Sequence, residues 1–86
     1  MENKKIIFGV LIKERIKDAT HIQGLLTKYG CNIKTRIGLH DVDNNICSPS
    51  GILILELIGL QSDIDTFESE LSKISEIVVK KMEFIY

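Results

Sequence analysis

An internal repeat constrains the fold of this chain more than any other feature of its sequence. Residues 8–39 align with residues 53–84 without a gap, at a constant offset of 45. The aligned positions share apolar character, at a period of two in the outer segments and of about 3.6 in the segment between them. Matched pairs are Phe8 with Leu53, Val10 with Leu55, Ile12 with Leu57, Ile22 with Phe67, Leu26 with Leu71, Tyr29 with Ile74, Ile33 with Val78, Ile37 with Met82, and Leu39 with Phe84. The sequence therefore predicts two successive βαβ halves.

Each half predicts two strands and the helix between them. The strands are expected at 5–13, 32–39, 51–58 and 77–85. Apolar stripes at helical spacing are formed by Ala19, Ile22, Leu26 and Tyr29, and by Ile64, Phe67, Leu71 and Ile74. We expect the first helix to begin at an Asp18 N-cap, or slightly earlier within 14–17, and to end at Gly30. The second is expected to begin in the capping-box-like segment 62–65.

The chemistry of the strands predicts their order in the sheet. The first and third strands are apolar on both sides and are expected at the centre, whereas charged residues place the second and fourth strands at the edges. With right-handed crossovers, the expected sheet is antiparallel with order 4-1-3-2 and both helices on one face. This is an α+β, ferredoxin-like βαββαβ sandwich, and it accounts for residues 1–86 as a single domain.

Composition excludes several classes of function. The chain has 86 residues, with 11 Lys and Arg against 12 Asp and Glu. Its net charge of −1 therefore lacks the excess of positive charge that direct nucleic-acid binding requires. The apolar run at 6–12 is too short for a signal peptide or a membrane span. We therefore expect a cytoplasmic protein without a membrane partner, in which Cys31 and Cys47 are reduced thiols.

One face of the expected sheet has no helix to cover it. If Phe8, Leu55 and their neighbours at period two face the helices, the opposite face carries Ile7, Leu11, Ile52, Ile54 and Ile58, with Glu56 among them. An apolar surface of this kind favours self-association, so we expect a homo-oligomer, most simply a dimer. In that assembly, Glu56 is expected to pair with a lysine across the interface. The alternative is a monomer that tolerates these aliphatic side chains, some of them covered by loops.

Three segments resemble a known family. Thr35-Arg36-Ile37-Gly38-Leu39, the stretch at 51–56 and the stretch at 78–82 are similar to the iron-only hydrogenase system regulators. The resemblance spans nearly the whole chain. It implies an ACT-like fold, similar to the C-terminal domain of nickel-responsive repressors, and an oligomeric regulatory role.

The ACT-like resemblance also implies where a small-molecule effector would bind. ACT domains often bind effectors, commonly amino acids, where subunits meet near the turn from the first strand into the first helix. This turn, at 13–18, contains Arg15 but not the Pro-Gly pair common in amino-acid-binding ACT domains. Arg36 and Gly38 are further candidates, because Arg36 is expected on the helix-distal face, where its guanidinium can bind an anion. The alternatives are a solvated Arg15 and an Arg36 paired with Glu56.

The segment 40–47 holds a candidate metal site. His40 and Cys47 have side chains that suit nickel or zinc, and Asp41 and Asp43 lie between them. Two such ligands do not complete a site, and the surrounding residues are typical of turns. We therefore favour a polar, mobile connection between strands two and three, and we expect no cofactor.

The sequence thus favours regulation over catalysis. It has no GxSxG, HExxH or phosphate-loop pattern, so we expect no enzyme activity. The predicted function is a small homo-oligomeric regulatory module, a transcriptional regulator or a small-molecule sensor, linked to iron-only hydrogenase. The alternatives are a ligand-free assembly or adaptor module and, less favoured, a small ferredoxin-like enzyme.

Overall fold

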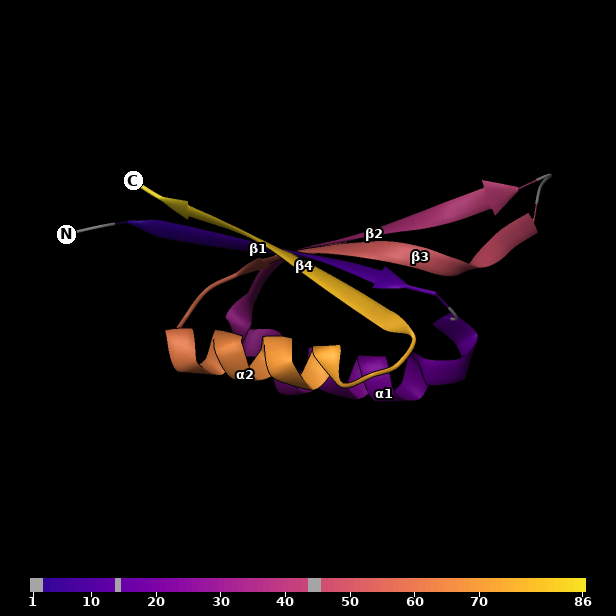
Figure 1. The fold of residues 1–86 in the computed structure, drawn as a ribbon, viewed down its shortest axis with the longest axis horizontal. Coiled ribbons are helices and arrows are strands. Elements are labelled where there is room, and N and C mark those ends of the chain that lie inside the picture. Colours follow the sequence, from indigo (N-terminus) through magenta and orange to yellow (C-terminus); the bar gives the residue numbers. More distant parts are fainter. Residues whose placement is uncertain (1–2, 14, 44–45) are drawn as a thin grey trace.

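The computed structural model describes residues 3–13, 15–43 and 46–86, with the side chains at 15–18 and 40–50 left out of that description. Its elements are β1 (Lys4–Ile12), α1 (Arg15–Lys28), a 3-10 turn (Gly30–Asn32), β2 (Ile33–Asp43), β3 (Ile46–Leu57), α2 (Gln61–Ser72) and β4 (Ile77–Ile85). The sheet is antiparallel with the order β2-β3-β1-β4, and both helices cover the same face (Figure 1). The predicted ferredoxin-like fold and strand order are confirmed.

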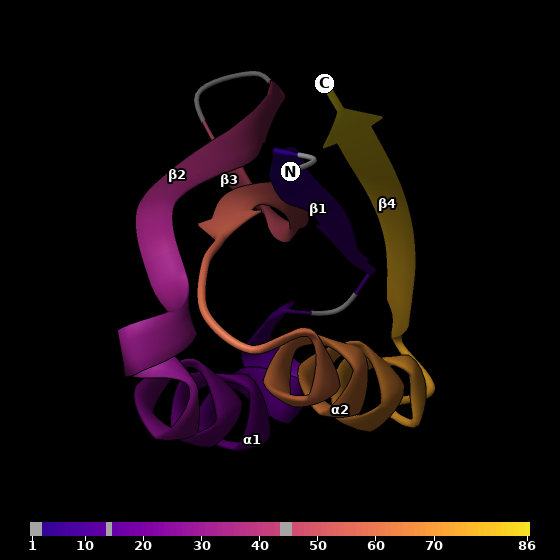
Figure 2. The ribbon, with the colours of Figure 1, turned by 90° about the vertical axis from the view of Figure 1, so that its left-hand side faces the viewer.

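Figure 2 shows the sheet and the two helices as two layers, and the hydrophobic core lies between them. Phe8 and Phe67 lie at its centre with no exposed surface, and their ring centroids are 5.8 Å apart. Tyr29, at the end of α1, stacks on Phe67 at 4.6 Å. Both members of most repeat pairs contribute: the buried set is Ile6, Phe8, Val10, Ile12, Ile22, Leu25, Leu26, Tyr29, Leu55, Leu57, Ile64, Phe67, Leu71, Ile74 and Ile77. The alternation that the repeat predicts for β1 and β3 is therefore confirmed.

Both helices begin earlier than their N-cap signals predict. Because α1 begins at Arg15, Asp18 lies inside the helix, and the earlier start within 14–17 is confirmed. The N-cap of α2 is Leu60, whose carbonyl oxygen accepts hydrogen bonds from the backbone N–H of Asp63 and Ile64, both at 3.1 Å. The capping-box prediction at 62–65 was wrong. The reason is that the chain turns directly after β3, at Gly59, so that the helix begins at the turn itself.

A β-bulge near the start of β2 changes which side chains face the helices. Ile33 lies opposite Leu57, but the next pair is Thr35 with Glu56, so Lys34 is an extra residue without a partner in the ladder. The extra residue reverses the alternation of β2. Beyond it, the side chains that would have faced the helices point to the uncovered face of the sheet, and the reverse. Ile37 is consequently 49% exposed, whereas alternation from Ile33, which places Arg36 on the helix-distal face, would have put Ile37 in the core.

The connection between β2 and β3 is shorter than predicted. The two strands continue to Asp43 and from Ile46, so most of the expected polar connection at 40–50 is a paired hairpin. This hairpin extends past the helices and gives the molecule its long dimension, with extents of 49 × 22 × 19 Å (Figure 1). Within the described residues, no helix has the length and apolar character that a membrane span requires.

Candidate functional site

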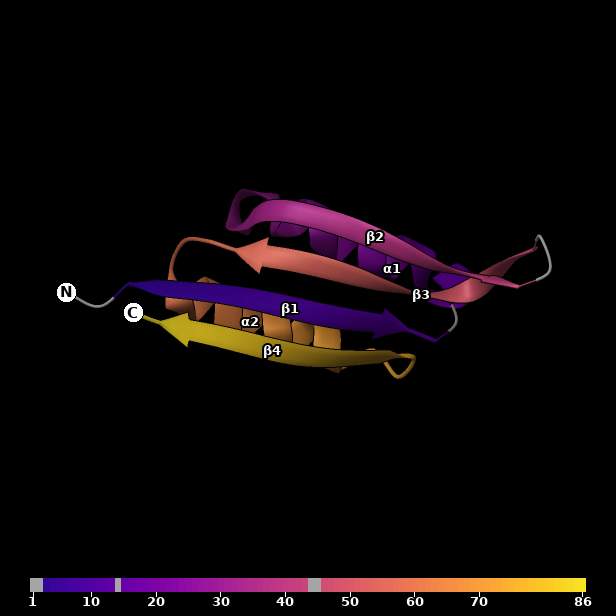
Figure 3. The same cartoon turned by 90° about the horizontal axis from the view of Figure 1, so that it is seen from above.

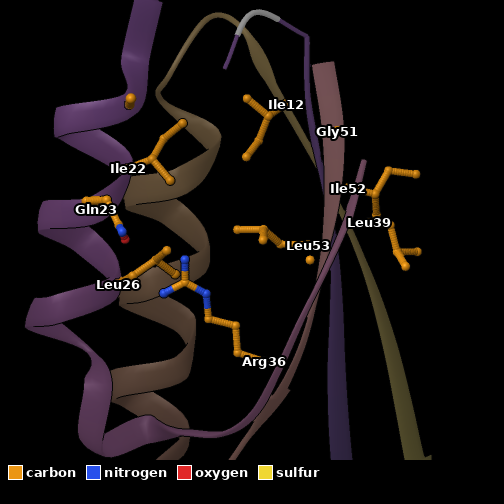
Figure 4. Close-up of a pocket in the computed structure, with 11 residues that line it drawn as sticks. Ile12, Ile22, Gln23, Leu26, Arg36, Leu39, Gly51, Ile52 and Leu53 are labelled. Atoms are coloured by element: carbon orange, nitrogen blue, oxygen red, sulfur yellow. The ribbon is translucent and has the colours of Figure 1, made fainter. Parts of the chain in front are cut away.

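A cavity of about 630 Å³ lies between α1 and the β2–β3 half of the sheet (Figure 4). Its lining comes from Ile12 of β1, Ala19, Ile22, Gln23 and Leu26 of α1, Arg36, Gly38 and Leu39 of β2, and Gly51, Ile52 and Leu53 of β3. Small residues help to keep it open: a Cβ on Gly38 would lie 3.6 Å from Leu53 Cδ2, so the glycine leaves room beside that side chain. The walls are mainly aliphatic.

Arg36 points into this cavity. It lies opposite Leu55 in the ladder, and Leu55 is fully buried beneath the helices, so both residues belong to the helix-covered side of the sheet. Figure 4 shows its guanidinium directed toward α1, near Leu26 and Gln23. The prediction that Arg36 and Gly38 lie on the helix-distal face was therefore wrong, and the extra residue Lys34 is the cause.

Glu56 does not pair with Arg36, because the two lie on opposite faces of the sheet. Its carboxylate accepts a hydrogen bond from the Thr35 hydroxyl at 3.3 Å and lies 4.0 Å from the Lys34 ammonium. Both partners come from the neighbouring strand of the same chain. The alternative that Arg36 serves as the partner of Glu56 is excluded within one subunit.

Figure 3 looks onto the face of the sheet that neither helix covers, to which all four strands contribute. Alternation along the ladders places on it Ile7, Leu11, Ile37, Leu39, Ile52, Ile54, Val78, Met82 and Phe84, which we call the apolar sheet face. Four of the five aliphatic residues predicted from the sequence belong to it. The fifth, Ile58, lies just past the end of β3 and is 45% exposed. The additions widen the predicted surface to both edges of the sheet: they are Ile37, Leu39, Val78, Met82 and Phe84.

The other candidate residues lie where the structure describes the backbone but not the side chains. Arg15 is the first residue of α1, but its side chain is outside the described residues. In the hairpin, His40 pairs with Gly51 and Cys47 pairs with Val42, and the side chains of His40 and Cys47 are likewise outside the description. Where side chains are described, no three His, Cys, Asp or Glu residues are grouped as a metal site requires.

Charge interactions also connect the two helices. The Lys28 ammonium lies 3.0 Å from a carboxylate oxygen of Glu70, and it lies 5.3 Å from the centre of the Tyr29 ring. The hydrogen bond from Lys28, with a smaller contribution from Tyr29, lowers the pKa of the Glu70 carboxyl. The same hydrogen bond raises the pKa of Lys28, and burial raises that of the Tyr29 phenol. Sequence spacing gave no sign of this contact, because it joins different helices.

Comparison with solved structures identifies the class of fold. The uncharacterized protein TM1266 from Thermotoga maritima is 23% identical, with a TM-score of 0.79 over 95% of this chain and 99% of that one. CPII, a nitrogen regulatory PII-like protein from Thiomonas intermedia K12 bound to ADP, AMP and bicarbonate, is 8% identical, with a TM-score of 0.64 over 100% and 96%. A formyltetrahydrofolate deformylase from Pseudomonas putida KT2440 is 11% identical, with a TM-score of 0.62 over 91% of this chain and 28% of that enzyme.

These similarities show a ferredoxin-like, ACT-like small domain. At such low identities they establish the fold and not the function. No family model and no curated protein sequence matches the chain.

Proposed function

We propose that this chain is a homo-oligomeric regulatory module that senses a small molecule and acts by binding, not by catalysis. The observation that carries the proposal is the apolar sheet face. It spans all four strands on the side of the sheet that neither helix covers (Figure 3). At about 25 cal/mol per Å² of apolar surface removed from water, covering such a face favours association by many kcal/mol before the entropy of association is subtracted.

A second copy of the chain suits this face because its polar residues carry both signs of charge. Glu56 of β3 and Lys80 of β4 lie on the same side of the sheet as the apolar residues, on either side of the central strand β1. A two-fold arrangement of two copies can bring Glu56 of each subunit close to a lysine of the other. Gly9 lies between Ile54 and Lys80 at the centre of this face, where the absence of a side chain lets a second copy approach the backbone of β1.

The cavity and the apolar sheet face share the same strand segments. Gly38 and Leu53 lie on the cavity side, whereas the adjacent Leu39 and Ile52 point to the apolar sheet face (Figure 4). A molecule that shifts β2 or β3 in the cavity would therefore change the shape of the surface on the other side. Such differential binding to two states is what a sensor requires.

The resemblance at 35–39, 51–56 and 78–82 extends the proposal to regulation of an iron-only hydrogenase system, as a transcriptional regulator or as a sensor within it. An adaptor module without a ligand would use the same apolar sheet face but would have no use for the cavity. Binding measurements on the cavity therefore separate these two functions.

Self-association is tested by light scattering coupled to gel filtration. We expect the wild-type chain to have at least twice its monomer mass of 9.7 kDa. Ile54→Lys should dissociate it, since an unpaired ammonium would be desolvated in the centre of the interface. Leu60→Lys is the matched control: it introduces the same charge at a side chain that is 68% exposed next to α2, and it should leave the mass unchanged. A wild-type monomer at all concentrations contradicts the proposal.

A further inference from the structure

We propose that the cavity between α1 and the β2–β3 half of the sheet binds a small monocarboxylate with an apolar body, and that Arg36 holds the carboxylate. This inference rests on the proposed sensing function and specifies its ligand. It also moves the binding site from the expected junction between subunits to a cavity within one subunit.

The walls favour a hydrocarbon group. Leu39 and Ile52 point away from the cavity, but most of the side chains that face it are aliphatic, and those of Ile12 and Leu53 point from the sheet toward Ile22 of α1 (Figure 4). The volume of about 630 Å³ falls within the range of roughly 300–1,000 Å³ typical of small-molecule sites. Transfer of a ligand's apolar atoms from water to these walls provides the non-directional part of the binding free energy.

The polar groups favour an anion with a single charge. Among the described lining residues, Arg36 is the one with a charged side chain, and its guanidinium has no salt bridge to any side chain that the structure describes. A guanidinium presents parallel N–H donors that match the two oxygens of a carboxylate. Gln23 adds an amide on the facing helix, near Arg36 (Figure 4). Ligands with several negative charges would require more than one cation.

The same lining disfavours amino acids. A bound amino acid would bring an ammonium group next to its carboxylate, and none of the lining residues that the structure describes is an Asp or a Glu that can pair with it. Arg36 is itself exposed, so this second charge would lose only part of its hydration, but it would gain no partner in return, which reduces affinity. We therefore expect the site to prefer a carboxylic acid over the amino acid with the same carbon skeleton.

Isothermal titration calorimetry tests this preference with 4-methylpentanoate, octanoate and 3-phenylpropanoate as probes. At least one should bind saturably, whereas leucine, 4-methylpentan-1-ol and inorganic phosphate should bind at least tenfold more weakly. Backbone amide signals of Gly38 and Gly51 should shift in NMR spectra on binding, and that of Gly30, which does not line the cavity, should not. Binding of leucine or phosphate as tight as that of the carboxylates, or no binding of any carboxylate, would overturn the inference.

Three variants locate the site. Arg36→Gln should reduce carboxylate affinity at least tenfold, and Arg36→Lys, which keeps the charge but loses the paired donors, should give an intermediate loss. Ala19→Leu fills the cavity from an exposed helix position without breaking the helix, and should abolish binding while the melting temperature is maintained. Unchanged affinity in all three contradicts the location. A monomeric protein that still binds carboxylates contradicts the proposed oligomeric function alone, whereas an oligomer without carboxylate binding contradicts this inference alone.

Discussion

Arg36 lies opposite Leu55 in the β2–β3 ladder, and the two side chains share the helix-covered side of the sheet. One residue further along, Ile37 lies opposite Ile54 on the apolar sheet face. This pairing places a guanidinium where the sequence predicts an aliphatic side chain. It thereby puts a charged group into a cavity whose other described lining residues are uncharged, and it adds aliphatic area to the opposite face.

Measurements of stability can test which side chains of β2 face the helices. Leu55→Ala should lower the free energy of unfolding by about 2–5 kcal/mol, because it leaves a void in the core. Ile37→Ala should lower it by about 1 kcal/mol or less, since half of that side chain is already exposed. Urea denaturation measures both, at protein concentrations low enough to dissociate any oligomer. Equal losses for the two variants would place Ile37 in the core and contradict the bulge.

The repeat predicts the helix-covered side of β1 and β3 correctly because those strands pair without interruption. The same reasoning fails in β2, where one extra residue, Lys34, reverses the alternation that follows it. Nothing in the residue types near Lys34 indicates a bulge, since no glycine or proline is present at 33–37. The position of Arg36, and with it the candidate site, therefore depends on tertiary pairing that alternation in one strand does not reveal.

The hairpin at the ends of β2 and β3 was missed for a related reason. Its polar and turn-forming residues suggest a loop, but backbone hydrogen bonds can pair two strands whatever their side chains. Between the pairs His40–Gly51 and Val42–Cys47, three residues of β3 lie against one of β2, and Pro49 is among them. Proline has no N–H to donate, so it is accommodated in this irregular stretch.

The turn before α2 depends on Gly59, which has a φ of +100°. Gly59→Ala should lower the free energy of unfolding by about 1–3 kcal/mol, because the added Cβ is strained there and would lie 2.6 Å from Asn32 Nδ2. Asn32 would have to move and lose its 3.0 Å hydrogen bond to the Ile58 carbonyl oxygen. Thermal denaturation measures the effect.

Gly24→Ala is the control for Gly59→Ala. This glycine lies inside α1, and nothing described lies within 4 Å of an added Cβ. The substitution should raise the free energy of unfolding by roughly 0.5–1 kcal/mol, because alanine is the better helix former. If Gly59→Ala and Gly24→Ala change the free energy of unfolding equally, the positive φ of Gly59 does not strain an alanine at that position.

We predict that no tight metal site forms at His40 and Cys47. The hairpin that carries them is paired through its backbone ladder, and two such residues supply only half of a tetrahedral site. Incubation with EDTA should therefore leave the melting temperature unchanged. One nickel or zinc ion retained per subunit after gel filtration, and lost in His40→Ala or Cys47→Ser, would contradict this prediction.

The ion pair between Lys28 and Glu70 should make stability depend on pH in a defined direction. The pKa of Glu70 is lowered from 4.5 in the folded protein, chiefly by the hydrogen bond from Lys28. Its contribution to the free energy of unfolding is therefore fully present above pH 4.5 and is lost as the pH falls through the folded pKa. At the alkaline end the sign reverses: the pKa of Lys28 is raised from 10.5, so its contribution is present below that pH and is lost as the pH rises through the folded pKa.

Denaturant midpoints measured across this range for the wild type, Glu70→Gln, Lys28→Gln and the double variant test the pair. Each single variant should be less stable than the wild type near neutral pH, and the Glu70→Gln difference should shrink in acid, where the wild-type carboxyl is itself protonated. Because each variant removes the same contact, their effects should not add in the double variant. Additive effects, or a Glu70→Gln difference that persists unchanged in strong acid, would mean that this ion pair does not stabilise the contact between α1 and α2.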